Sequence, residues 1–204
     1  SMESTMDALQ LAEAKGLTIV CDINYRKNLW GYGMQPHDVI YNMMQYSDIV
    51  FGDQNEWEVA SGVKHIPFNA LDAGYVINRE AYQEYFRKMH VLFPKCKKMV
   101  MALRNQLASS HHTLTGLLYD AVHDCLYTTK IYDIQPIVDP MGVGDAFVAG
   151  YIHAHQKWAA DNQYCLDFAL SASARKNTIP GDQNLVTEEE IISNLTSSGG
   201  RIQR

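Results

Sequence analysis

The chain has 204 residues, 47% of them hydrophobic, which is enough to bury one substantial core. Its 17 Lys and Arg against 23 Asp and Glu give a formal net charge of -6 without a basic run, which argues against nucleic acid and anionic membranes as partners. The four cysteines are isolated from one another, so they predict neither a disulfide framework nor a zinc site.

The chain carries no recognisable targeting segment. No stretch approaches the roughly 20 consecutive apolar residues of a transmembrane helix, and the N-terminus lacks a charged region followed by an apolar core. The leading Ser1-Met2 resembles the remnant of an expression tag. A cytoplasmic protein with reduced cysteines is therefore the expected setting.

Helix and strand patterns alternate along the first half. Apolar residues at helical spacing over residues 6–15 end at Gly16, and residues 17–21 form a short apolar run typical of a buried parallel strand. The pattern recurs as a helix over 39–45, a strand over 49–51 and a helix over 54–60 that is closed by Gly62. Such alternation predicts a layered α/β fold.

The second half adds an antiparallel edge and then helices. A helix over 80–93 precedes a third buried strand over 99–103, and residues 114–119 and 125–129 predict a strand pair around a polar turn. Helices are predicted over 142–158 and 162–176, and Thr187 caps a last helix whose first turn is acidic. Neither a repeat nor a linker is visible, so residues 1–204 are expected to contain no domain boundary.

A glycine-rich loop leads directly into one of these helices. The amides of Gly142, Val143, Gly144 and Asp145 would be first-turn donors at the positive end of the helix dipole, an arrangement that binds phosphate. Asp145 could accept the proton of an incoming hydroxyl, and low basicity is no objection because phosphoryl transfer has a loose transition state. Read alone, the stretch is equally compatible with an ordinary helix N-terminus that has an acidic cap.

The same stretch resembles the C-terminal signature D-T-x-G-x-G-D-x-F-x-x-G of the ribokinase (PfkB) family of sugar kinases. Six residues occupy the family's positions, namely Asp139, Gly142, Gly144, Asp145, Phe147 and Gly150, while Pro140 replaces the threonine. The resemblance implies a ribokinase-like three-layer α/β/α sandwich, with ATP as co-substrate and Mg²⁺ as cofactor. It also implies that Asp145 is the catalytic base and that the amides of residues 142–144 form the anion hole.

A polar cluster follows the strand that ends at Cys21. In an extended chain Asp22, Asn24 and Arg26 project to one side, beyond the carboxyl end of a strand, where α/β sheets place ligands. On these residues alone, a surface Asp–Arg pair is the simpler interpretation. Together with the following Leu-Trp, however, the segment resembles 2-keto-3-deoxygluconate kinases and related fructokinases. This implies that Arg26 binds the acid end of the substrate, with Asp22 and Asn24 beside it.

Two further segments resemble elements of the family. Asn55 and Glu58 match its N-x-x-E element, which implies that Asn55 contacts nucleotide and that Glu58 orders waters around magnesium. An ordinary acidic first turn of a helix is the alternative. Residues 177–182 resemble an I-P-G-D segment, which implies that Asp182 approaches the sugar and that Asn177 borders the adenine. A plain turn is equally compatible with that sequence.

One segment departs from the family pattern. Where the family has a strand followed by a glycine-containing loop near ATP, residues 101–112 read MALRNQLASSHH and contain no glycine. Arg104 and the following Ser/His stretch are expected to take part in nucleotide binding in place of that loop, and a modified or weakened nucleotide site is the alternative.

The resemblance covers only the later part of a complete kinase, because the N-terminal strands and the β lid of the family are absent. It implies ATP-dependent phosphorylation of a sugar acid, most closely 2-keto-3-deoxygluconate to its 6-phosphate, with the full-length enzyme a homo-oligomer. The 204-residue chain by itself is expected to be inactive. A fructokinase or another sugar kinase of the family is an alternative, as is a noncatalytic nucleotide-binding or interaction module.

Overall fold

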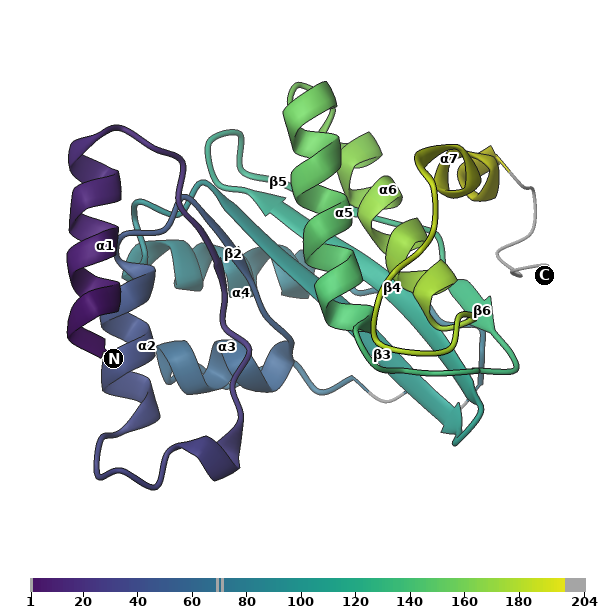
Figure 1. Cartoon of the computed structure of the whole chain (residues 1–204), viewed down its shortest axis with the longest axis horizontal. Helices are drawn as coiled ribbons and strands as arrows, with labels where there is room; N and C mark the ends of the chain where they lie inside the picture. The colour runs from purple at the N-terminus through teal and green to yellow at the C-terminus, as the bar shows by residue number, and fades with distance from the viewer. Residues whose placement is uncertain (1, 69, 71, 197–204) are drawn as a thin grey trace. The chain divides into compact units, whose positions relative to one another are not determined.

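The computed structural model describes residues 2–68, 70 and 72–196. The first part of the chain contains α1 (Met2–Ala14), β1 (Val20–Asp22), the 3-10 turn η1 (Lys27–Leu29), α2 (Pro36–Met44), β2 (Ile49–Phe51), α3 (Gln54–Ser61) and α4 (Arg79–Leu92) (Figure 1). The remainder contains β3 (Lys98–Ala108), β4 (His111–Asp120), β5 (Cys125–Thr128), β6 (Tyr132–Ile134), α5 (Val143–Trp158), α6 (Asn162–Lys176) and α7 (Glu188–Thr196).

The described strands form one sheet with the order β1-β2-β3-β4-β5, in which β6 pairs with β4. The pairs β1/β2 and β2/β3 are parallel, whereas β4 and β6 are antiparallel. This confirms the predicted mixture of helices with parallel strands and an antiparallel edge. In the part of the chain that the structure describes, no helix is both long and apolar enough to cross a bilayer.

Two strands differ from their predicted bounds. The parallel strand predicted over 17–21 is present as β1, but its predicted bounds and burial are wrong, because β1 covers residues 20–22 and Val20 is 36% exposed. Val20 is exposed because β1 lies at the end of the strand order, where β2 is its one neighbour among the described strands. In contrast, β3 extends five residues beyond the predicted end at Leu103, since exposed Arg104 alternates with buried Asn105 as on a strand with one covered face.

The contacts divide the chain into two compact units. The first unit comprises residues 1–67, 78–101 and 119–126, and the second comprises residues 68–77, 102–118 and 127–204. Each unit combines several separated stretches, and both β3 and β4 pass from one unit into the other. The absence of a domain boundary in the sequence stays a prediction.

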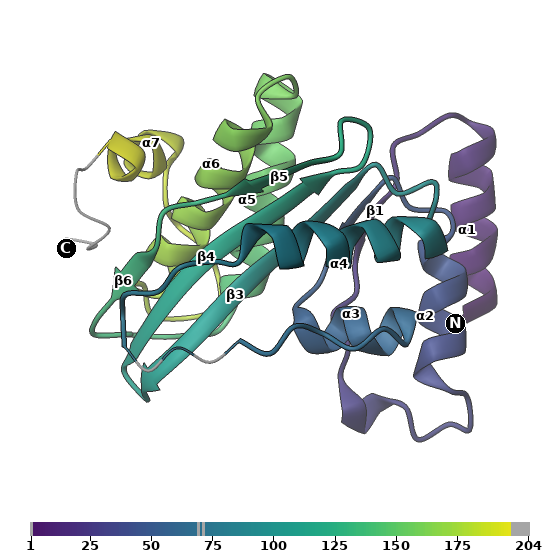
Figure 2. The same ribbon diagram turned by 180° about the vertical axis from the view of Figure 1, so that it is seen from behind.

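Aromatic packing fixes the end of β2 in the first unit. Trp57 of α3 and Phe86 of α4 are fully buried and meet edge to face, with ring centroids 6.2 Å apart. Phe86 also stacks on Tyr119, so α4 covers this face of the unit (Figure 2). A Cβ on Gly52 would lie 3.2 Å from the Trp57 ring, so the chain passes closely over that ring. The segment that leads from β2 to the N-x-x-E element is therefore packed closely against α3.

Small residues bring α5 and α6 together in the second unit (Figures 1 and 2). A Cβ on Gly150 would lie 2.9 Å from Ala172 Cβ and 3.1 Å from Ala169 Cα. On its other side α6 lies on β4, because Leu166 Cδ1 is 3.1 Å from the Cβ position of Gly116. The close α5–α6 contact fixes the position of the N-terminus of α5.

Replacing Gly150 with alanine is expected to lower the free energy of unfolding by about 1–3 kcal/mol, because the added methyl group meets the Ala172 Cβ and the Ala169 Cα, neither of which can rotate aside. Urea denaturation measures the effect. Gly144→Ala, on the same helix and with nothing within 4 Å of its Cβ position, is the matched control. Equal stability of the two variants would contradict the close packing of α5 on α6.

Candidate functional site: the N-terminus of α5

The glycine-rich motif forms a turn that ends in α5. Gly142 is the N-cap of this helix, with a left-handed φ of 72°, and a Cβ there would clash with the carbonyl oxygen of Asp182. The first helical hydrogen bond runs from the Ala146 N–H to the Gly142 carbonyl oxygen at 2.9 Å. The amides of residues 143–145 therefore belong to the first turn, where the helix itself offers them no acceptor. This is the backbone geometry that the predicted anion hole requires.

Asp139 joins this turn to the segment around Gly181. Its carboxylate accepts hydrogen bonds from the Met141 and Gly181 amides, both at 2.9 Å. These two bonds, with a smaller contribution from the charge of Lys176, lower the pKa of Asp139. In addition, the Asn177 carbonyl oxygen accepts from the amide of Val138 at 2.8 Å. Two motifs about 40 positions apart in sequence thus form one structural unit.

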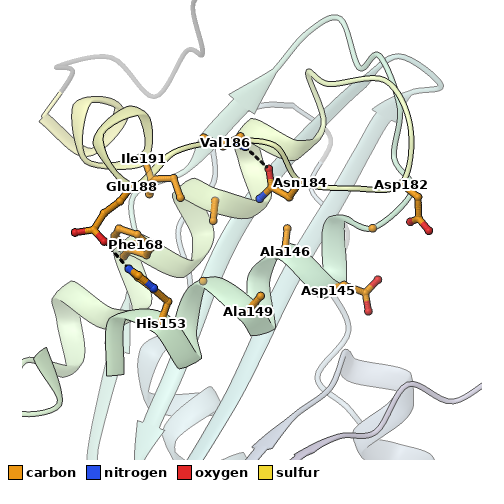
Figure 3. A pocket seen from close by; sticks show the side chains of 13 residues that line it. Asp145, Ala146, Ala149, His153, Phe168, Asp182, Asn184, Val186, Glu188 and Ile191 are labelled. Atoms are coloured by element: carbon orange, nitrogen blue, oxygen red, sulfur yellow. Dashed lines mark hydrogen bonds and ion pairs between the residues drawn. The ribbon is translucent and has the colours of Figure 1, made fainter. Parts of the chain in front are cut away.

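A cavity of about 360 Å³ runs from this junction along α5. Asp145 and Asp182 lie at one end of it, as Figure 3 shows. Its walls are largely apolar and include Ala146 and Ala149 of α5, together with Val186 and Ile191 from the chain around α7. The candidate catalytic carboxylate therefore borders a hollow whose sides are apolar.

An ionic cluster that the sequence analysis missed lies at the far end of the cavity. His153 Nε2 lies 2.6 Å from Glu188 Oε2, and Lys157 also donates to that oxygen (Figure 3 shows the first pair). The bond from Lys157, followed by that from His153, lowers the pKa of Glu188. These residues lie 31 and 35 positions apart from Glu188, so no local sequence pattern connects them.

The substrate-binding residues predicted near β1 lie in the first unit, and one detail of their arrangement is wrong. Asn24 has a φ of 44°, so the chain is not extended between Asp22 and Arg26 and the three residues do not alternate as on a strand. Asparagine tolerates this left-handed conformation better than most residues because its short polar side chain bonds locally. All three side chains are nevertheless exposed, and the Arg26 side chain is 61% accessible.

Glu56 is a second residue that the sequence analysis did not single out. It completes a capping box with Asp53, in which each side chain accepts from the other residue's amide at 2.8 Å. Its Oε1 also lies 3.7 Å from the Arg26 guanidinium. Burial raises the pKa of Glu56. The pattern D-x-x-E at residues 53–56 was the available signal, since it is typical of a helix start.

The residues of the N-x-x-E element lie on α3 in the first unit. Asn55 is exposed on the first turn of the helix. The Glu58 carboxylate is occupied by His65, whose amide donates to it at 3.2 Å and whose Nδ1 lies at 2.6 Å. These contacts lower the pKa of Glu58, so it stays ionised as water-mediated binding of a cation requires.

The two remaining nucleotide-binding candidates lie in the second unit. Arg104 is exposed on β3, so the loop expected at this position is a strand, and the hairpin turn comes later at Ser109 and Ser110. Asn177 is 2% exposed, and its side-chain amide donates to the Ser173 carbonyl oxygen at 3.0 Å. Contact of either residue with nucleotide stays a prediction.

The structure thus groups the predicted site residues into two sets. Gly142, Val143, Gly144, Asp145 and Asp182 converge on one junction in the second unit, whereas the residues around β1 and α3 gather in the first. Within the described residues, no group of three or more His, Cys, Asp or Glu side chains is arranged to hold a metal ion.

Comparisons with known proteins place this geometry in a family context. No family model and no curated protein matches the sequence. Among solved structures, 2-dehydro-3-deoxygluconokinase from Thermotoga maritima superposes with a TM-score of 0.80 and 28% identity over 94% of this chain and 54% of that one. A PfkB family carbohydrate kinase from Listeria grayi superposes with a TM-score of 0.80 and 23% identity over 96% of this chain and 55% of that one.

A fructokinase from Vibrio cholerae, solved with fructose, ADP and calcium ion, gives a TM-score of 0.70 at 17% identity and covers 95% of this chain and 55% of its own. The chain therefore spans about half the length of the structures it matches. The resemblance that the glycine-rich motif indicated is confirmed at the level of structure: over about half the length of those proteins, this chain has the ribokinase-like α/β fold of the PfkB-family carbohydrate kinases.

Proposed function

We propose that these residues form the later part of an ATP-dependent kinase that phosphorylates a hydroxyl group of a sugar acid, with 2-keto-3-deoxygluconate as the substrate. The observation that carries this proposal is the junction at the N-terminus of α5. There a left-handed Gly142 presents first-turn amides beside Asp145, and Asp182 packs against the same turn. Anion-binding amides beside a carboxylate suit a reaction in which phosphate is transferred to a hydroxyl.

In this mechanism the chain's own groups orient the substrate hydroxyl and stabilise the charge on the transferred phosphoryl group. The amides of residues 143–145 donate to the phosphoryl oxygens, where negative charge is spread in the transition state. Asp145 accepts a hydrogen bond from the substrate hydroxyl and takes up its proton as the new P–O bond forms, while the bond between the γ-phosphorus and the β-phosphate oxygen breaks and ADP leaves. A magnesium ion, when bound, neutralises phosphate charge, and Glu58 would orient its water shell.

The substrate assignment rests on Arg26 as the partner of the acid group, with Asp182 expected to approach the sugar. An exposed guanidinium can bind a carboxylate through two parallel hydrogen bonds, and a neutral sugar has no carboxylate to offer. The likeness to the Thermotoga maritima 2-dehydro-3-deoxygluconokinase supports the same choice. The Vibrio cholerae structure, which contains fructose and ADP, favours a fructokinase as the second candidate.

The test is magnesium- and ATP-dependent ADP release by the protein produced from its complete open reading frame, with 2-keto-3-deoxygluconate and fructose in parallel. Turnover with the keto acid supports the proposal. Turnover with fructose alone would retain the kinase and reject the substrate. No turnover with either would favour a noncatalytic nucleotide-binding or interaction module. The 204-residue chain by itself is expected to bind nucleotide weakly and to release no ADP.

Arg26→Gln is expected to raise KM for the keto acid roughly ten- to a hundredfold, the scale of hydrogen bonds to a charged group, and to leave KM for fructose unchanged. Steady-state kinetics on both substrates measure the difference. Lys27→Gln, an exposed cation at the next position, is the matched control. An equal change in KM for both substrates would show that Arg26 does not recognise the acid group.

A further inference from the structure

Lys176 is a lysine with no exposed surface. It is the last residue of α6, and its side chain is 0% accessible, which is unusual because lysine is rarely fully buried without a partner. Its ammonium donates to the Ile179 carbonyl oxygen at 3.3 Å. A buried ammonium costs free energy unless hydrogen bonds or an opposite charge compensate it. The neighbours of this group therefore indicate what it does.

These neighbours belong to the turn that leads from α6 to Asp182. The Ile179 amide donates back to the Lys176 carbonyl oxygen at 3.2 Å, so the lysine contacts this turn through both its backbone and its side chain. Two residues later, the Gly181 amide donates to Asp139 at 2.9 Å. The ammonium is thus attached to the segment that places Asp182 against Gly142.

The last turn of α6 also contacts the glycine-rich loop directly. Ser173 Oγ donates to the Val143 carbonyl oxygen at 3.0 Å, and the Asn177 carbonyl oxygen accepts from the amides of Val138 and Asp139. This network also contains the carboxylate of Asp139, whose pKa the charge of Lys176 helps to lower. The buried lysine therefore lies where α6, the turn 177–181 and the loop 138–143 meet.

We propose that Lys176 is a positioning residue of the phosphate site: its buried ammonium holds the turn 177–181 against Asp139 and so keeps the amides of residues 143–145 in the arrangement that receives phosphate. It touches no substrate itself. The part of this proposal that concerns phosphate rests on the proposed nucleotide-dependent function. A methionine would fill the same space but would leave the Ile179 carbonyl oxygen and Asp139 without the cation.

The competing explanation is that Lys176 only caps a helix, since cations near a helix C-terminus bind the last carbonyl groups and interact favourably with the dipole. The two explanations differ in what they predict. A cap contributes to stability, so its loss lowers the free energy of unfolding. A positioning residue acts on the loops that it holds, so its loss increases amide exchange in those loops more than in the rest of the second unit, whatever the change in global stability.

The experiment compares Lys176→Met with Lys88→Met in the protein produced from the complete open reading frame. Lys88 is an exposed lysine paired with Glu84 at 3.9 Å. Isothermal titration with MgADP, urea denaturation and amide hydrogen exchange are measured on each. For Lys176→Met we expect affinity to fall at least about tenfold, and we expect exchange to increase at residues 141–145 and 178–182 more than in the rest of the second unit. Lys88→Met should match the wild type in all three.

Two outcomes would overturn the proposal. Exchange in both loops that equals the wild type would show that Lys176 does not hold them. A fall in the urea midpoint with the loops no more affected than the rest of the second unit would show a helix cap. If the wild-type chain itself does not bind MgADP, the proposed nucleotide site fails, and the exchange measurement still decides the role of Lys176.

Discussion

Asp145→Asn is expected to lower kcat for sugar phosphorylation by about 10²–10⁴-fold, the usual contribution of a positioned general base, with little change in affinity for MgADP. An asparagine keeps the shape and the hydrogen bond to the hydroxyl but cannot take up its proton. Because Asp145 lies in the first turn of α5, where the amides attract anions, loss of its charge should not weaken phosphate binding. Initial-rate kinetics and calorimetry on the product of the complete open reading frame measure both quantities.

The matched control is Asp38→Asn. Asp38 also lies in the first turn of a helix, α2, and is exposed, so it reports the effect of removing such a charge away from the site. This control should retain wild-type rates. An Asp145→Asn variant with a kcat within about threefold of the wild type would exclude Asp145 as the base, because removing a positioned general base costs far more than that.

Local patterns were sufficient for much of the fold. The predicted bounds of α6 agree with the structure, and α3 is capped by Gly62, whose φ of 72° is the left-handed conformation that a helix-terminating glycine adopts. These elements have strong periodicity and clear end signals. The strand β6 was not predicted, since it is three residues long and pairs with β4 about 20 positions earlier. A strand this short forms because a partner strand pairs with it, and a local sequence pattern carries no information about that partner.

The site shows the same division between local and distant information. The loop with Gly142 and Asp145 was predicted because its glycines and acid are adjacent in sequence. In contrast, its attachment to the segment 177–182 depends on Asp139 accepting from Gly181, and the pairing of Arg26 with Glu56 crosses 30 positions. The buried Lys176 gave no signal, because nothing in the residues around it distinguishes a buried lysine from an exposed one at a helix end.

Gly142→Ala is expected to disrupt the junction at the start of α5. Its φ of 72° disfavours a side chain by about 1–2 kcal/mol, and the new methyl group would also clash with the Asp182 carbonyl oxygen and lie 3.1 Å from its carboxylate. Because backbone cannot move aside as a flexible side chain can, the loops 139–145 and 177–182 must separate. We therefore expect lower stability together with a loss of MgADP affinity of at least about tenfold, the scale of one hydrogen bond to a charged group.

Gly144→Ala is the matched control, two residues later in the same motif. Gly144 lies inside α5 with nothing within 4 Å of its Cβ position. An alanine there should raise the free energy of unfolding by about 0.5–1 kcal/mol, because the unfolded chain loses conformational freedom. If the turn has the described conformation, urea denaturation gives stability changes of opposite sign for the two variants, and calorimetry shows loss of MgADP affinity for Gly142→Ala alone. Equal stability and equal affinity of the two variants would show instead that Gly142 does not adopt the left-handed turn on which the phosphate site depends.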